Sequence, residues 1–103
     1  AGGGGAAYTA SKHALAGFTR QLALDYAKDK IQVFGIAPGA VKTAMTASDF
    51  EPGGLADWVA QETPIGRWSN PEEIADLTEF LASGKASSMQ GEIIKIDGGW
   101  SLK

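Results

Sequence analysis

Residues 31–43 read IQVFGIAPGAVKT, and they predict one buried strand of a parallel sheet. The first part, residues 31–37, is short, mostly apolar and contains β-branched side chains, as expected of a parallel strand covered on both faces. Pro38 and Gly39 end this strand, because proline has no N–H to donate within a central ladder. The chain therefore leaves the sheet at Pro38 and enters a loop.

A helix is predicted between Asn70 and Ser83. Asn70 can cap it, Pro71 suits the first helical position, and Glu73 stands where a capping box requires an acidic residue. Gly84 then ends the helix. Its apolar stripe consists of Ile74, Leu77 and Leu81.

A second strand is predicted over residues 92–97 (EIIKID), and Gly98 and Gly99 close it in a turn to which Asp97 belongs. The order strand, helix, strand is a βαβ unit, which is typical of a doubly wound sheet. Two parallel strands need further strands beside them and helices on both faces. We therefore expect an α/β fold that is the C-terminal part of a doubly wound, Rossmann-like parallel-sheet domain.

An earlier helix is predicted from Tyr8 to about Lys28. Its apolar stripe consists of Leu15, Phe18, Leu22 and Tyr26, and five alanines extend a surface of low bulk around the rest. The preceding run, Gly2–Gly5, resembles a phosphate cradle only superficially, and we favour a flexible loop between a strand and a helix. The single histidine, His13, is interpreted as an ordinary helix residue.

Residues 44–66 show no long period and predict a loop with a short helix, the usual build of an active-site lid. Trp58 in this loop either lines a substrate pocket or packs beneath the lid. Trp68 and Trp100 are predicted to be core or interface anchors.

Composition and charge exclude several classes of function. The net charge of -3 leaves no basic footprint for a nucleic acid. No apolar run approaches the ~20 residues of a membrane span. With no cysteine and one histidine, a zinc site built by the protein is not expected. A cytoplasmic location is expected by default.

Tyr8 and Lys12 are the candidate catalytic residues. They stand four residues apart on one helix and therefore share a face. A lysine ammonium beside a phenol favours the phenolate, so such a pair can pass a proton to or from a substrate oxygen. The same spacing also arises on solvated helices that have no catalytic role, so the pair alone is a weak signal.

Four motifs in one order strengthen the hypothesis. They are residues 8–14 (YTASKHA), residues 31–43, the pair 64–67 (PIGR) and 70–75 (NPEEIA), and residues 91–99 (GEIIKIDGG). Together they resemble the C-terminal part of the short-chain dehydrogenase/reductase family, over essentially the whole chain. The resemblance implies that residues 1–103 are the C-terminal portion of one such domain, without its N-terminal nucleotide-binding portion.

The resemblance also implies roles for Tyr8 and Lys12. Tyr8 would be the acid in carbonyl reduction and the base in alcohol oxidation, whereas Lys12 would favour the phenolate and bind the nicotinamide ribose. The family's glycine-rich dinucleotide motif, its catalytic serine and its relay asparagine are expected upstream of Ala1. Residues 1–103 alone therefore do not supply a complete site.

The cofactor implied by the resemblance is NAD or NADP, without a choice between them. Pro38 and Gly39 would shape the wall beside the nicotinamide. Val41, through its backbone, and Thr43 would hold the carboxamide, and such positioning carries much of the rate enhancement.

Within the family, the sequences of these motifs most resemble those of 3-oxoacyl-(acyl-carrier-protein) reductases of fatty acid biosynthesis. Other members of the family act on sugar alcohols, diketones or steroids. The expected partners are a small or carrier-bound carbonyl substrate and further copies of the chain, in a dimer or tetramer. The expected contact face contains Leu15, Phe18 and Leu22, or Leu77 and Leu81. The alternative is a catalytically silent module that only self-associates.

Overall fold

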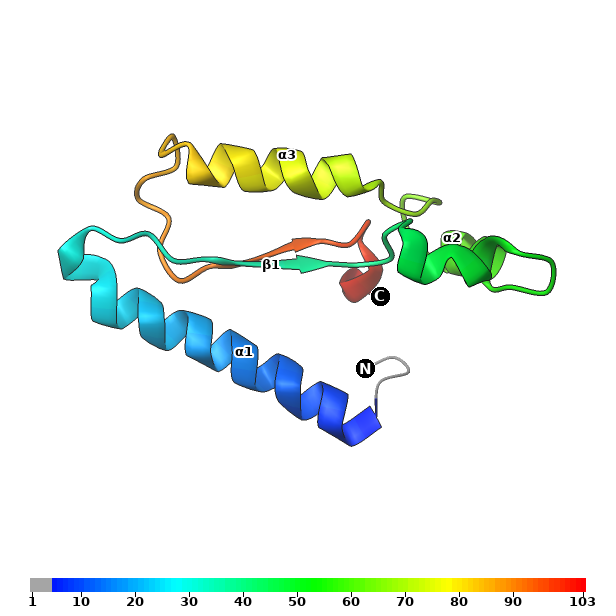
Figure 1. The fold of residues 1–103 in the computed structure, drawn as a ribbon, viewed down its shortest axis with the longest axis horizontal. Coiled ribbons are helices and arrows are strands. Elements are labelled where there is room, and N and C mark those ends of the chain that lie inside the picture. Colours follow the sequence, from blue (N-terminus) through cyan, green and yellow to red (C-terminus); the bar gives the residue numbers. More distant parts are fainter. Residues whose placement is uncertain (1–4) are drawn as a thin grey trace. The chain divides into compact units, whose positions relative to one another are not determined.

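The computed structural model describes residues 5–103, which form helices and two strands (Figure 1). The elements are α1 (Gly5–Tyr26), η1 (Ala27–Asp29), β1 (Gly35–Pro38), η2 (Ala44–Phe50), α2 (Ala56–Glu62), α3 (Pro71–Ala82), β2 (Ile93–Ile96) and η3 (Trp100–Leu102). The chain forms two compact units, one of Ala1–Gly35 with Ala86–Ile94 and one of Ile36–Lys85 with Lys95–Lys103.

The two strands form one parallel sheet, with β1 beside β2 (Figure 1). The Gly35 amide donates to the Glu92 carbonyl at 2.9 Å, and the Gly39 amide donates to the Ile96 carbonyl at 3.1 Å. Partner numbers rise together along both strands, which is the register of a parallel pair. The predicted α/β fold with a parallel sheet is confirmed, and both strands are shorter than the sequence indicates.

Helix α1 packs through small side chains, and its predicted apolar stripe, the expected contact face, is left largely exposed. Its buried residues are Thr19 and Ala23, whereas Leu15 and Phe18 are 59% and 60% exposed. A Cβ on Gly91 would come within 3.2 Å of the Ala23 Cβ. The helix therefore lies so close to this glycine that only small side chains fit on the packed face.

The N-terminal glycine run lies mostly outside the described residues. Gly2–Gly4 are not described, and Gly5, predicted to be in a loop, is the first residue of α1. None of the helices within residues 5–103 is both long enough and apolar enough to cross a membrane.

Helix α3 begins and ends where the sequence predicts. Asn70 and Glu73 form the capping box, Pro71 occupies the first turn, and Gly84 follows the helix with φ +83°. Leu81 is only 2% exposed. It belongs to the core of the chain, so the expectation that Leu81 forms an open contact face is wrong.

The segment between β1 and α3 contains more helix than expected. The predicted short helix is α2, and the 3₁₀ segment η2 precedes it. Within α2, the Trp58 ring packs edge to face on the Trp100 ring, with 6.4 Å between the ring centroids. The Lys103 ammonium lies over the Trp100 ring and binds the Glu62 carboxylate at 3.2 Å. The C-terminal residues therefore hold the far end of α2.

Candidate active-site residues

Tyr8 and Lys12 lie on one face of α1, as their spacing predicts. The Lys12 Nζ lies 5.3 Å from the centroid of the Tyr8 ring. Tyr8 is 54% exposed. The ammonium and the aromatic ring therefore form an exposed cation–π pair.

His13 does not join this pair. Its Nδ1 lies 2.9 Å from the Thr9 carbonyl, one turn back along α1. A ring bound to its own helix backbone fits the interpretation of an ordinary helix residue. Within residues 5–103, no cluster of three or more histidine, aspartate or glutamate side chains could hold a metal ion.

The predicted cofactor residues follow the carboxyl end of β1, where Val41 is held by Ser69. The Ser69 amide donates to the Ala40 carbonyl at 2.9 Å, and the Lys42 amide donates to the Ser69 carbonyl at 3.0 Å. In such a parallel bridge the two hydrogen bonds flank Val41, whose own N–H and C=O point away from Ser69. In the described part of the chain, the Val41 N–H donates to no other group.

The hydroxyl of Thr46 organises the turn that follows Val41, a role that is not among the predictions from the sequence. This hydroxyl lies 3.0 Å from the Val41 carbonyl and 3.1 Å from the Thr43 carbonyl, and it accepts the Thr43 amide at 2.9 Å. Thr43 precedes η2 as its N-cap residue. The signal for this role was the threonine pair three residues apart, which is typical of a capping turn.

Three of the predicted cofactor residues meet at one groove. Pro38, Val41 and Thr43 line it on one side, and residues of α3 line the other, in a volume of about 720 Å³. The α3 side includes Ile74 and Ala75, so the walls are mostly apolar. The carboxyl end of β1 thus places an apolar surface next to the backbone N–H of Val41.

Close packing requires a glycine at position 39. An added Cβ would come within 2.8 Å of the Asp97 Cα. Asp97 in turn holds the closing turn through the Gly99 and Ser101 amides, at 3.0 and 3.2 Å. The side-chain hydrogen bond with Ser101 is the largest of the causes that hold the pKa of Asp97 below its usual value, and desolvation opposes it. The turn at residues 97–101 therefore supports the chain beneath Gly39.

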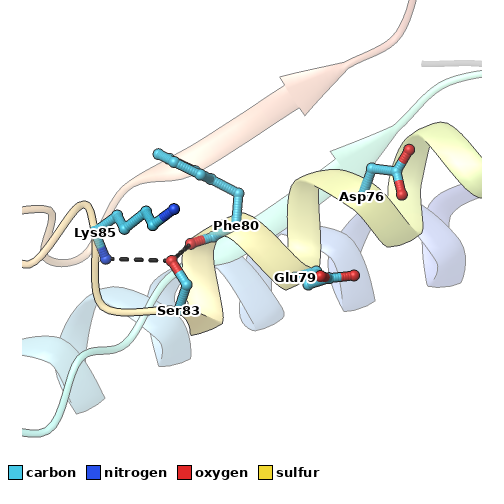
Figure 2. Close-up of a pocket in the computed structure, with 5 residues that line it drawn as sticks. All are labelled: Asp76, Glu79, Phe80, Ser83 and Lys85. Atoms are coloured by element: carbon cyan, nitrogen blue, oxygen red, sulfur yellow. Dashed lines mark hydrogen bonds between the residues drawn. The ribbon is translucent and has the colours of Figure 1, made fainter.

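A second hollow, of about 270 Å³, lies at the C-terminal end of α3 (Figure 2). Its lining residues are Asp76, Glu79, Phe80, Ser83 and Lys85. The Ser83 hydroxyl donates to the Phe80 carbonyl and accepts the Lys85 amide, so it closes the helix end. None of the predicted site residues lines this hollow, and its serine is already used by the helix.

Comparison with known proteins assigns the chain to a family. The family model described as enoyl-(acyl carrier protein) reductase matches residues 1–101. The 2-dehydro-3-deoxy-D-gluconate 5-dehydrogenase of Bacillus subtilis (strain 168) is 40% identical over 94 residues, which are 91% of this chain and 37% of that protein.

Solved structures agree with this match. A 4-hydroxyisoleucine dehydrogenase complexed with NADH has a TM-score of 0.88 at 36% identity, over 94% of this chain and 40% of its own. A putative 2-deoxy-D-gluconate 3-dehydrogenase from Agrobacterium tumefaciens with bound NADP has a TM-score of 0.86 at 38% identity, over 93% of this chain and 39% of its own. The chain spans less than half the length of these relatives. It belongs to the short-chain dehydrogenase/reductase family, of which it matches the C-terminal part.

Proposed function

We propose that the whole enzyme containing this chain transfers a hydride between NAD or NADP and a carbonyl or alcohol substrate. The observation that carries the proposal is the pairing of Tyr8 and Lys12 at 5.3 Å on α1, in a chain of this family. The relatives crystallised with NADH and NADP support a nicotinamide cofactor. A bound nicotinamide supplies the hydride in reduction and accepts it in oxidation.

The residues after β1 fit the nicotinamide end of such a cofactor. The ring is flat and its carboxamide both donates and accepts hydrogen bonds. The apolar surface at Pro38 and the open N–H of Val41 match these two needs. In this proposal Val41 and Thr43 orient the carboxamide, Pro38 and Gly39 form the wall beside the ring, and Lys12 binds the ribose.

Tyr8 is the proposed proton carrier. In reduction its hydroxyl donates a proton to the substrate oxygen as the carbonyl carbon receives hydride, and in oxidation the phenolate takes that proton back. Because Tyr8 is half exposed, the site needs a further covering group before water is excluded.

For the substrate we propose a keto sugar acid. Two of the relatives carry names of gluconate-type dehydrogenases, and these names replace the narrower expectation of a 3-oxoacyl-(acyl-carrier-protein) substrate. The carrier-bound class stays as the second candidate, because the matching family model is described as an acyl-carrier-protein reductase. Cytoplasmic location and assembly from several copies remain part of the proposal.

The test is a steady-state assay of the whole enzyme with NADH and NADPH. It compares 5-keto-D-gluconate, the keto acid named for a 5-reductase of Escherichia coli (strain K12), with an acetoacetyl thioester, and it follows oxidation of the reduced cofactor by absorbance. We expect kcat/KM for the sugar acid to exceed that for the thioester by at least about tenfold. The reverse order would select the carrier-bound class. Absence of both turnover and cofactor binding would leave the silent, self-associating module as the better description.

A further inference from the structure

Trp68 contacts the segment between β1 and α3 at two places. Its ring lies 4.8 Å from the Phe50 ring, centroid to centroid, with the planes tilted by 55°. Its indole N–H donates to the Ala56 carbonyl at 3.0 Å. Phe50 ends η2 and Ala56 begins α2. Trp68 therefore holds both halves of the segment where they approach each other.

The same residue is tied to the predicted cofactor residues. Trp68 precedes Ser69, whose backbone bridges to Val41 and whose side chain is only 4% exposed. On the Phe50 side, the Lys42 ammonium lies 4.9 Å from the Phe50 ring centroid. Lys42 stands between Val41 and Thr43 in the chain. The backbone bridge from Ser69 and the contact between Lys42 and Phe50 therefore both link the chain around Val41 to the residues that Trp68 contacts.

The two contacts of Trp68 differ in the side chain that they require. The ring contact with Phe50 is apolar and tolerates another aromatic side chain. The N–H bond to Ala56 requires an indole, and Ala56 is only 9% exposed, so water does not readily replace the lost donor. Substitution with phenylalanine therefore removes one interaction and keeps the other.

We propose that Trp68 is a positioning residue that fixes the start of α2 relative to Val41, and thereby sets the affinity for the carbonyl substrate. This inference rests on the proposed function and on the sequence-based expectation that residues 44–66 form a lid over the substrate. The cofactor residues keep their own support, because the backbone of Ser69 holds Val41 whatever side chain stands at position 68. Loss of the indole N–H should consequently affect substrate binding more than cofactor binding.

The test compares Trp68→Phe with Trp100→Phe in the whole enzyme. In Trp68→Phe we expect amide hydrogen exchange in residues 56–62 to quicken about two- to tenfold, the effect of one hydrogen bond. The KM for 5-keto-D-gluconate should rise by a similar factor, whereas the Kd for the reduced cofactor and the exchange around residues 38–43 stay within about twofold. Trp100→Phe keeps an aromatic ring against Trp58 and should change none of these quantities.

A second variant keeps the inference testable if Trp68→Phe folds poorly. Phe50→Leu removes the ring contact and leaves the indole bond, and it should quicken exchange in residues 44–50. Unchanged exchange in both variants, or equal changes at residues 38–43 and 56–62, would overturn the positioning role. If the wild-type enzyme turns over neither probe substrate, the proposed function fails, and the exchange measurements still decide whether Trp68 holds the segment.

Discussion

Replacement of Gly39 with alanine tests the packing beneath the cofactor residues. An ideal Cβ at this position lies 2.8 Å from both the Cα and the Cβ of Asp97 and 3.2 Å from the Asp97 carbonyl oxygen. Carbon atoms in ordinary contact are about 3.5–4.0 Å apart. The overlap falls on backbone, and the Gly39 amide is held to the Ile96 carbonyl at 3.1 Å, so neither strand end moves freely.

The expected cost of Gly39→Ala is about 1–3 kcal/mol in the free energy of unfolding, the range for overpacking in a well-packed site. The matched control is Gly17→Ala, in the interior of α1, where an added Cβ meets no atom within 4 Å. Alanine is favoured over glycine in a helix interior by about 0.5–1 kcal/mol. The change from glycine to alanine should therefore destabilise the folded protein at position 39 and stabilise it at position 17.

Urea denaturation of the whole protein measures both variants against wild type. With the m-value unchanged, the midpoint of Gly39→Ala should fall and that of Gly17→Ala should rise. A Gly39→Ala midpoint at or above the wild-type value would refute the close approach of Asp97. A change of m-value in either variant would indicate that the unfolding transition itself had changed.

Three further predictions concern catalysis, pH and assembly. Tyr8→Phe should lower kcat by about 10²–10⁴-fold and leave the cofactor Kd within about twofold, and retention of most of the wild-type kcat would contradict the assignment. The pKa of Glu73 is held below its ordinary value of 4.5, first by the hydrogen bond from Arg67. This ion pair therefore adds stability at neutral pH that is lost as the pH falls through the lowered pKa, so urea midpoints of wild type and Glu73→Gln should differ at pH 7 and converge in acid. Phe18 is 60% exposed on α1, and Phe18→Ser should reduce the mass that light scattering reports for the assembled protein, whereas a monomeric wild type with a sharp melt would refute self-association.

The sequence predicts the local features of the fold well, because their causes lie within a few residues. Helix α3 starts at its capping box, and Gly84 follows its end. The sequence predicts the bulky stripe of α1 as a contact face, but it does not identify Thr19 and Ala23 as the residues through which α1 packs within this chain. The face that packs is selected by distant glycines such as Gly91, which permit close approach only to small side chains.

In the candidate site, too, the sequence predicts contacts within one helical turn and misses contacts between distant residues. Tyr8 and Lys12 come together because four residues make about one helical turn, so their spacing was sufficient. Thr46 was within reach of sequence reasoning through its spacing from Thr43. The role of Trp68 was not, because its partners Phe50 and Ala56 are set by the path of the whole segment.

Ser69 explains why part of this site leaves no trace in sequence. It holds Val41 through its own N–H and C=O, which every residue except proline possesses, so no particular side chain is required for the bond. The position is nevertheless constrained in size, because its side chain is 4% exposed beside the start of α3. A small residue directly before a helix cap is common and indicates nothing by itself. Its meaning appears only when the bridge to Val41 shows that the start of α3 and the predicted cofactor residues share one support.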